Sequence, residues 1–185
     1  QLPKLADGPF QGLPRVFGLV WAFVAHTDSR FDSNTWCAYI HAYQEVQPLT
    51  IGELWASAIT LRIILIENLR RIAERIVYSR DERRIADEIA DRLLSAPAAD
   101  QTEDDLIAEL GPAAPSEALA LQLIHRLRDQ RPALTAMLGR LDDRLAADGR
   151  TTDSAIHDEQ QRQIAANVTV RNIITSMRHI SDVDW

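Results

Sequence analysis

The sequence predicts an all-α protein, an irregular helical bundle around one long central helix at about residues 50–95. The stretch 49–76 carries most of this prediction, because Arg62 is the only charge between Glu53 and Glu67. A helix that is apolar on nearly every side is normally buried. No proline occurs within 50–95, so nothing there breaks the helix. The chain has only seven glycines and eight prolines in 185 residues, which also favours helices over a sheet.

Two shorter helices are predicted before the central one. Residues 1–12 read as an extended lead-in, because prolines and glycines interrupt any periodic pattern. The first helix is predicted at 14–26, where a proline fits the first turn and apolar residues form a broad face. The second is predicted at 33–45, with Asp32 or Ser33 as its N-cap and aromatic residues on one stripe.

The central helix has a defined start and a changing surface. Thr50 and Glu53 have the spacing of a capping box, in which each residue satisfies an amide of the other. The second half, 70–92, interleaves seven arginines with six acids, which predicts a solvated and nearly neutral face. Further helices are predicted after it at 102–110, 116–131, 132–148 and 153–179.

We expect residues 1–185 to form a single helical domain excised from a larger chain, with a weak internal boundary near 97–115. The larger chain is expected because the sequence starts at Gln1 rather than at Met and stops at Trp185, just after a helical segment. Cys37 is the only cysteine, which fits a reducing compartment. The sequence has no signal-peptide pattern and no uncharged run near the ~20 residues that a membrane span needs.

Charge and composition exclude several classes of function. The net charge is −7, which argues against a general nucleic-acid binder, because such proteins need a basic face. The histidines lack metal-ligand spacing, and no glycine-rich phosphate loop occurs. Asp182 and Asp184 have the Asp-x-Asp form that holds a metal ion in many glycosyltransferases, but they follow a helix at the chain terminus. We interpret Ser181 or Asp182 as the cap of a following helix. The sequence therefore predicts no cofactor, metal or catalytic residue in this chain.

The two glutamates of the central helix are too far apart for paired-carboxylate chemistry. Glu53 and Glu67 are 14 residues apart, which is about 21 Å along a helix. A glycosidase pair needs a separation of about 5–10 Å. We interpret Glu67 as the partner of Arg70 or Arg71 in a local ion pair.

Arg62 lies in the most apolar part of the sequence. A buried arginine needs a carboxylate or several carbonyl groups as partners. We therefore predict that Arg62 is buried in an ion pair, with Asp28, Asp32 or Glu45 as the available carboxylates. The alternative is an anion site for a phosphate or a sugar phosphate.

Tryptophans and tyrosines gather in the N-terminal half of the chain. These residue types are common in protein cores and are also common platforms for stacking sugars. Their helical spacing favours the core. If they are exposed, the residues that could stack on a sugar are Trp36, Tyr43 and Trp55.

Three stretches together carry a family resemblance. The motif in the central helix reads PLTxGELWA at 48–56, LR at 61–62 and LIENLRR at 65–71. The stretches 13–26 and 167–178, with the final Asp184-Trp185, add to it. The chain thus resembles the N-terminal region of bacterial cyclic β-1,2-glucan synthases, although the likeness is thin between about 81 and 148.

The resemblance implies a very large inner-membrane parent that transfers glucose from UDP-glucose to make cyclic β-1,2-glucan. This piece would be a noncatalytic helical scaffold domain on the cytoplasmic side. It would contact other domains of the parent and reach the membrane only through the parent chain. Glu53 would then act as a cap partner, Arg62 and Glu67 as buried ion-pair members, and Asn68 as a hydrogen-bonding link. The motif residues taken as structural are Thr50, Glu53, Trp55, Arg62, Glu67, Asn68 and Arg71.

Other functions remain open from the sequence. The main alternative is a carbohydrate-binding module that holds the growing β-1,2-glucan on exposed aromatic residues. A stand-alone enzyme would require Glu53, Arg62 and a histidine to meet in a closed cleft. A ligand-binding helical regulator is disfavoured by the acidic charge and by the absence of a recognition-helix motif.

Overall fold

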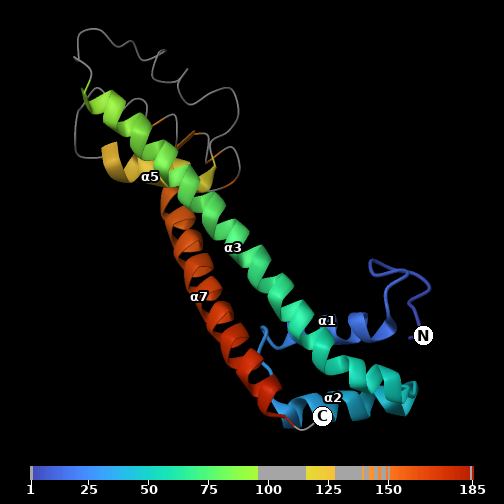
Figure 1. Cartoon of the computed structure of the whole chain (residues 1–185). Coiled ribbons are helices and arrows are strands. Elements are labelled where there is room, and N and C mark those ends of the chain that lie inside the picture. Colours follow the sequence, from blue (N-terminus) through green and yellow to red (C-terminus); the bar gives the residue numbers. More distant parts are fainter. Residues whose placement is uncertain are drawn as a thin grey trace. The chain divides into compact units, whose positions relative to one another are not determined.

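The fold of the chain is helical in a computed structural model (Figure 1). The structure describes residues 2–95, 116–127, 139, 142, 143, 146, 149, 151–183 and 185. The helices in these residues are α1 (Arg15–His26), α2 (Ser33–Val46), α3 (Ile51–Ser95), α5 (Glu117–Leu127) and α7 (Thr152–Asp182). The predicted all-α class is confirmed, and α3 coincides with the predicted central helix. The helix predicted at 102–110 and most of the one predicted at 132–148 lie outside the described residues.

The chain divides into two compact units. The first comprises Gln1–Ala73 and Ala165–Trp185, and the second comprises Glu74–Ile164. The helices α3 and α7 each contribute residues to both units. The weak boundary predicted near 97–115 lies outside the described residues, and the single domain stays a prediction.

The first unit is built on the apolar faces of α1, α2, the first half of α3 and the last part of α7. α2 starts where the Asp32 carboxylate accepts a hydrogen bond from the Thr35 amide at 2.8 Å, as the predicted N-cap requires. α1 instead starts after Pro14, which has no N–H group to satisfy. The buried residues of its core include Val16, Val20, Phe23, Trp36, Leu61, Ile64, Leu65, Ile72, Ile173 and Ile180.

The second unit has a smaller core between α3 and α5. Each helix contributes a stripe with i, i+3 and i+4 spacing, which places the buried residues on one face. The Ser116 hydroxyl accepts a hydrogen bond from the Leu119 amide at 3.2 Å and so caps the start of α5. The buried residues are Ala86, Ile89, Ala90, Leu93, Ala120, Leu123, Ile124 and Leu127. Among the residues that the structure describes, no helix is long and apolar enough to cross a membrane.

Candidate functional site

The most completely buried charge in the described residues is the Glu53 carboxylate at the start of α3. Its side chain has no solvent exposure, and that of Arg15 is 13% exposed. The Arg15 guanidinium donates to both carboxylate oxygens of Glu53, with N–O distances of 2.8 and 2.7 Å. It also donates to the Pro48 carbonyl oxygen at 3.1 Å. Arg15 therefore joins the start of α1 to the loop before α3 and to the first turn of α3.

The predicted capping box surrounds the same carboxylate. The Thr50 amide donates to a Glu53 carboxylate oxygen at 2.9 Å, and the Thr50 hydroxyl donates to the same oxygen at 3.0 Å. The Glu53 amide in turn donates to the Thr50 hydroxyl oxygen at 3.3 Å. The sequence pattern identified this half of the site, whereas Arg15 was missed.

The electrostatics of this centre keep Glu53 ionised. The hydrogen bond from Arg15 lowers the pKa of Glu53 most strongly, the bonds from Thr50 lower it further, and burial opposes them. The same hydrogen bond raises the pKa of Arg15. A general acid needs a pKa near the working pH and access to substrate. The Glu53 carboxylate has a lowered pKa, and it is buried with a full set of hydrogen-bond donors, so it lacks both a suitable pKa and access to substrate. This centre is therefore suited to a structural role.

A second buried polar centre fixes the turn between α1 and α2. The Ser176 hydroxyl accepts from the Phe31 amide at 2.7 Å and donates to the Ser29 carbonyl oxygen at 2.8 Å. The Asn68 side-chain amide donates to the Ser29 hydroxyl at 2.7 Å. Ser29 and Ser176 are each 1% exposed. Asn68 is therefore the hydrogen-bonding link that the motif predicted, and its partner is the turn.

The turn itself has a constrained backbone. Asp28 and Ser29 have φ angles of +48° and +62°, the left-handed region that residues other than glycine seldom adopt. Thr169 donates to the Asp28 carboxylate at 2.7 Å, and Asn172 donates to the Asp28 carbonyl oxygen at 3.0 Å. These contacts from α7 stabilise the backbone conformation, so the turn depends on residues more than 140 positions away.

The ion pair predicted for Arg62 is wrong. Arg62 is half-buried, and its guanidinium donates to the Ser181 hydroxyl of α7 at 3.5 Å instead of to a carboxylate. The carboxylates proposed as partners are used elsewhere or exposed, since Asp28 binds α7 and Asp32 caps α2. The physical reason is that the Arg62 side chain reaches the surface near the end of α7, so water solvates the charge and no buried partner is required.

The other motif residues also lie in structural contacts. Glu67 pairs locally with Arg70 at 2.8 Å, as expected, but its side chain is 40% exposed, so the prediction that it is buried is wrong. One helical turn places the two side chains together on the solvent side of α3. The Arg70 hydrogen bond lowers the pKa of Glu67. The Arg71 guanidinium lies 5.8 Å from the centre of the Trp21 ring, a cation–π distance.

The three predicted sugar-stacking residues have different environments. Trp36 is 6% exposed and meets the Phe23 ring edge-on at 4.9 Å, so it is a core residue and cannot stack on a sugar. Tyr43 is half-buried, and its hydroxyl donates to Gln47. Trp55 is 76% exposed and remains available. The structure does not join these three residues into one groove-forming platform, because one of them is in the core.

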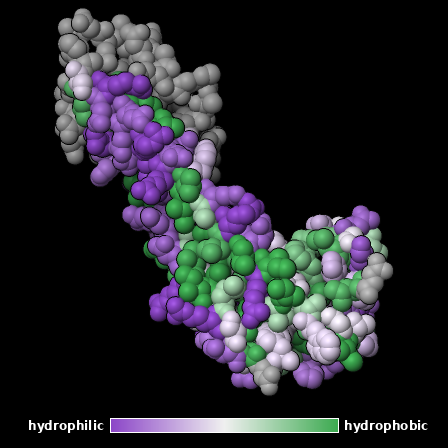
Figure 2. All heavy atoms as spheres, in the orientation of Figure 1, coloured by the Kyte–Doolittle hydropathy of each residue, from purple (hydrophilic) through white to green (hydrophobic). Residues whose placement is uncertain are grey.

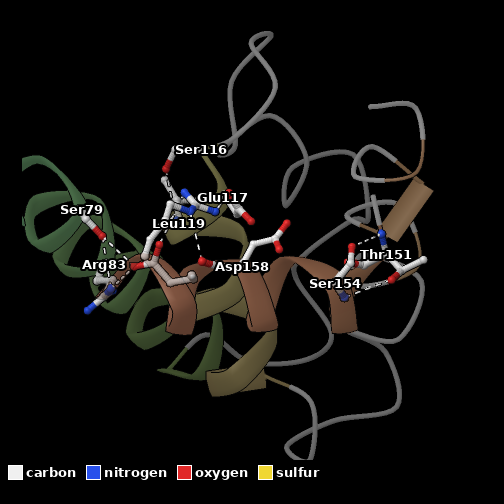
Figure 3. Close-up of polar contacts among 10 residues, drawn as sticks. Ser79, Arg83, Ser116, Glu117, Leu119, Thr151, Ser154 and Asp158 are labelled. Carbon is white, nitrogen blue, oxygen red and sulfur yellow. Dashed lines mark hydrogen bonds and ion pairs between the residues drawn. The ribbon is translucent and has the colours of Figure 1, made fainter. Parts of the chain in front are cut away.

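The second unit contains a polar network and a hollow. Figure 3 shows Ser79 and Arg83 of α3 near α7, and Ser116 with Glu117 at the start of α5. Arg83 pairs with Glu159, and Arg162 pairs with Glu117. A hollow of about 490 Å³ lies beside them, and its polar lining consists of Arg83, Gln122, His125, Glu159, Gln160 and Gln163. Amide and charged groups can bind hydroxyl groups, but no tryptophan or tyrosine is among the described residues that line this hollow.

The candidate metal ligands and acid–base residues of the sequence do not cluster in the described part of the chain. It contains no group of three or more histidine, cysteine, aspartate or glutamate side chains that could hold a metal ion. Asp182 is the last residue of α7, and Asp184 lies outside the described residues. Glu53 and Arg62 each bind other partners and do not meet in a cleft with a histidine.

Comparison with known proteins supports the family resemblance. No protein-family model matches the chain. Over 187 aligned residues that include the whole chain, it is 40% identical to the cyclic beta-(1,2)-glucan synthase NdvB of Rhizobium meliloti (strain 1021). The chain spans 6% of the length of that relative. The predicted resemblance to cyclic β-1,2-glucan synthases is confirmed, and the match is consistent with an N-terminal fragment of such a protein.

Proposed function

We propose that this chain is a noncatalytic helical scaffold segment of a cyclic β-1,2-glucan synthase, in which it positions other domains of the same polypeptide. The observation that carries the proposal is the 40% identity over the whole chain to a protein of that name. Because the chain corresponds to 6% of that protein, the activity belongs to the larger parent. The parent would transfer glucose from UDP-glucose on the cytoplasmic side of the inner membrane.

The contacts of the motif residues support a noncatalytic role. Thr50, Glu53 and Asn68 are all engaged with the chain itself, through the capping box, the Arg15 pair and the turn at Ser29. Side chains that bind substrate or transfer protons need a hydrogen-bonding position that is not already occupied and that faces an accessible cleft. These residues instead hold helix ends and a turn in place, which is what a scaffold requires.

The test separates chemical from structural roles in the full-length protein that contains this chain. Glu53→Gln, Arg62→Gln and Glu67→Gln are each introduced, and UDP-glucose turnover is measured per mole of folded protein. We expect turnover within about threefold of the wild type, since a lost acid or base costs about 10²–10⁴-fold. A drop of that size at a normal amount of folded protein, in any one variant, would contradict the proposal.

A second measurement tests the scaffold role itself. Removing residues 1–185 from the full-length protein should lower the yield of β-1,2-glucan, either through less folded synthase or through slower turnover. A deletion variant that accumulates normally and makes glucan at the wild-type rate would show that the segment positions nothing.

Glucan binding is the alternative function, and the exposure of Trp55 is the observation that keeps it open. Titration of the chain with β-1,2-glucan, followed by tryptophan fluorescence, would distinguish the two. Binding that Trp55→Ala removes would favour the carbohydrate-binding module. No binding at millimolar glucan would leave the scaffold role alone.

A further inference from the structure

The first half of α3 carries a row of exposed apolar side chains, here called the α3 stripe. It consists of Ile51, Trp55, Ile59, Ile63 and Ile66, which are 68%, 76%, 53%, 52% and 55% exposed. Steps of four and three residues place all five on one face of the helix, over about 22 Å of its length. Between Ile51 and Ile66 the only other exposed residue is Gly52. The one charge of this stretch that reaches the surface is the half-buried Arg62, which points to Ser181 of α7.

The opposite face of the same helix is already buried. Leu61, Ile64 and Leu65 are at most 1% exposed and belong to the core of the first unit. A helix that is apolar on all sides is stable in water only when both sides are covered. In Figure 2, apolar surface covers the part of α3 nearer to α1, whereas the part near α5 is mostly hydrophilic. The α3 stripe is therefore an apolar face that the described residues leave uncovered, and contiguous exposed apolar surface is characteristic of interaction sites.

We propose that the α3 stripe is the docking face for an apolar helix from a part of the same polypeptide outside this chain. The inference rests on the proposed function, under which this chain is a small segment of a far longer protein. The matched relative supports this, since the chain spans only 6% of it. A tethered partner binds in an intramolecular step, at an effective concentration that its linker sets and that does not depend on the protein concentration.

The geometry and charge of the α3 stripe define the chemistry of this partner. Residues at i and i+4 form the ridges that interdigitate with the grooves of a second helix. The five side chains of the stripe are apolar, so the partner residues that pack on them must be uncharged, because burying a charge there would be costly. The expected occupant is a helix with aliphatic or small residues along one face.

A lipid surface fits the same face less well. Helices that lie on membranes have a Lys/Arg-rich polar side opposite the apolar side. The opposite side of α3 is instead the core of the first unit. The net charge of −7 would also be repelled by the anionic lipids of a cytoplasmic leaflet. A second copy of the chain offers the same apolar ridge, but it lacks the tether.

Photo-crosslinking in the full-length protein tests the identity of the occupant. p-Benzoylphenylalanine is placed at Ile59 in the stripe or, as a control, at Ile174 of α7, which is also an isoleucine and is 48% exposed. We expect a crosslink from position 59 to a peptide outside residues 1–185 of the same molecule, several-fold stronger than from position 174. A crosslink to residues 1–185, in the same copy or in a differently tagged copy, would overturn the proposal, as would a lipid adduct or no crosslink above the control.

A matched pair of substitutions gives an independent readout. Ile63→Asp would place a carboxylate in the docked face, whereas Ile174→Asp changes the same residue type at nearly the same exposure, 52% against 48%. In the full-length protein we expect limited proteolysis within residues 1–185 to be at least about tenfold faster for Ile63→Asp than for Ile174→Asp. Equal rates for the two variants would overturn docking at the α3 stripe.

Crosslinking and proteolysis do not depend on glucan synthesis, so a failure of the docking proposal can be distinguished from a failure of the proposed function. If the crosslink forms in a protein that makes no β-1,2-glucan, the proposed function fails and docking stands. If glucan synthesis depends on this segment but position 59 does not crosslink, docking alone fails.

Discussion

The two units of the chain hold their ion pairs in different environments. In the first, Arg15 and Glu53 are 13% and 0% exposed, and the carboxylate accepts further hydrogen bonds from Thr50. In the second, Arg83 and Glu159 are 35% and 20% exposed. Exposed pairs are screened by water, whereas a buried carboxylate that loses its partner keeps its full desolvation cost. The comparison shows that the value of a pair depends on burial and on the completeness of its hydrogen bonds.

Removing the buried carboxylate should have the largest effect. Glu53→Ala leaves the Arg15 guanidinium part-buried without its partner and removes half of the capping box. We expect the free energy of unfolding of the chain to fall by about 3–5 kcal/mol, the range for breaking a buried pair. Urea unfolding followed by circular dichroism measures it.

Glu67→Ala is the matched control, because Glu67 is a glutamate on the same helix whose side chain is 40% exposed and whose partner Arg70 is 54% exposed. Loss of the Glu67 carboxylate should change the free energy of unfolding far less than loss of Glu53, because water screens an exposed ion pair. Equal losses for the two variants would mean that burial of Glu53 contributes nothing and that the comparison fails.

Acid should weaken the same centre. The pKa of Glu53 lies below its ordinary value of 4.5, so the carboxylate stabilises the fold above that pH. This stabilisation is lost as the pH falls through the lowered pKa. In urea unfolding between pH 7 and pH 3, the difference between the wild type and Glu53→Gln should therefore shrink below pH 4.5. A constant difference across that range would contradict the assignment, since Asp32 and Glu67 titrate equally in both proteins.

Local features of the fold were predictable because a few neighbouring residues determine them. The capping box joins residues three positions apart, and the Asp32 cap does the same for α2. The extent of α3 followed from its apolar run and from the absence of proline. Such features depend on backbone hydrogen bonding within one helical turn, which the sequence order displays directly.

The tertiary half of the candidate site was not predictable in this way. Arg15 reaches Glu53 across 38 positions, and Ser176 reaches Ser29 across 147. The sequence around Arg15 and around Ser176 has no feature that distinguishes these residues from polar residues on the surface. Arg62 shows the converse error, because an apolar neighbourhood in the sequence suggested burial although the helix turns its side chain toward Ser181. Which face of α3 is covered depends on packing by the remote α7.

The neutral buried centre should give an intermediate effect. Ser176→Ala removes the hydroxyl that joins the Phe31 amide to the Ser29 carbonyl oxygen. An unsatisfied buried group costs about 1–3 kcal/mol, so the unfolding free energy should fall by that amount. Ser181→Ala on the same helix is the control, because that hydroxyl is exposed and its loss should change stability by less than about 0.5 kcal/mol. Equal losses of unfolding free energy in the two variants would mean that the Ser176 contacts to the turn do not stabilise the fold.

The partly exposed pair of the second unit should give the smallest effect, and a double-mutant cycle measures it most directly. Arg83→Met and Glu159→Gln, alone and together, isolate the coupling between the two side chains. We expect about 0.2–1 kcal/mol at low salt and a smaller value at 1 M salt, where the Debye length is about 3 Å. The same cycle at Arg15 and Glu53 should give a larger coupling that changes little with salt, because burial excludes the screening ions. If salt reduced both couplings to the same degree, the two pairs would share one environment, and the contrast between the units would be lost.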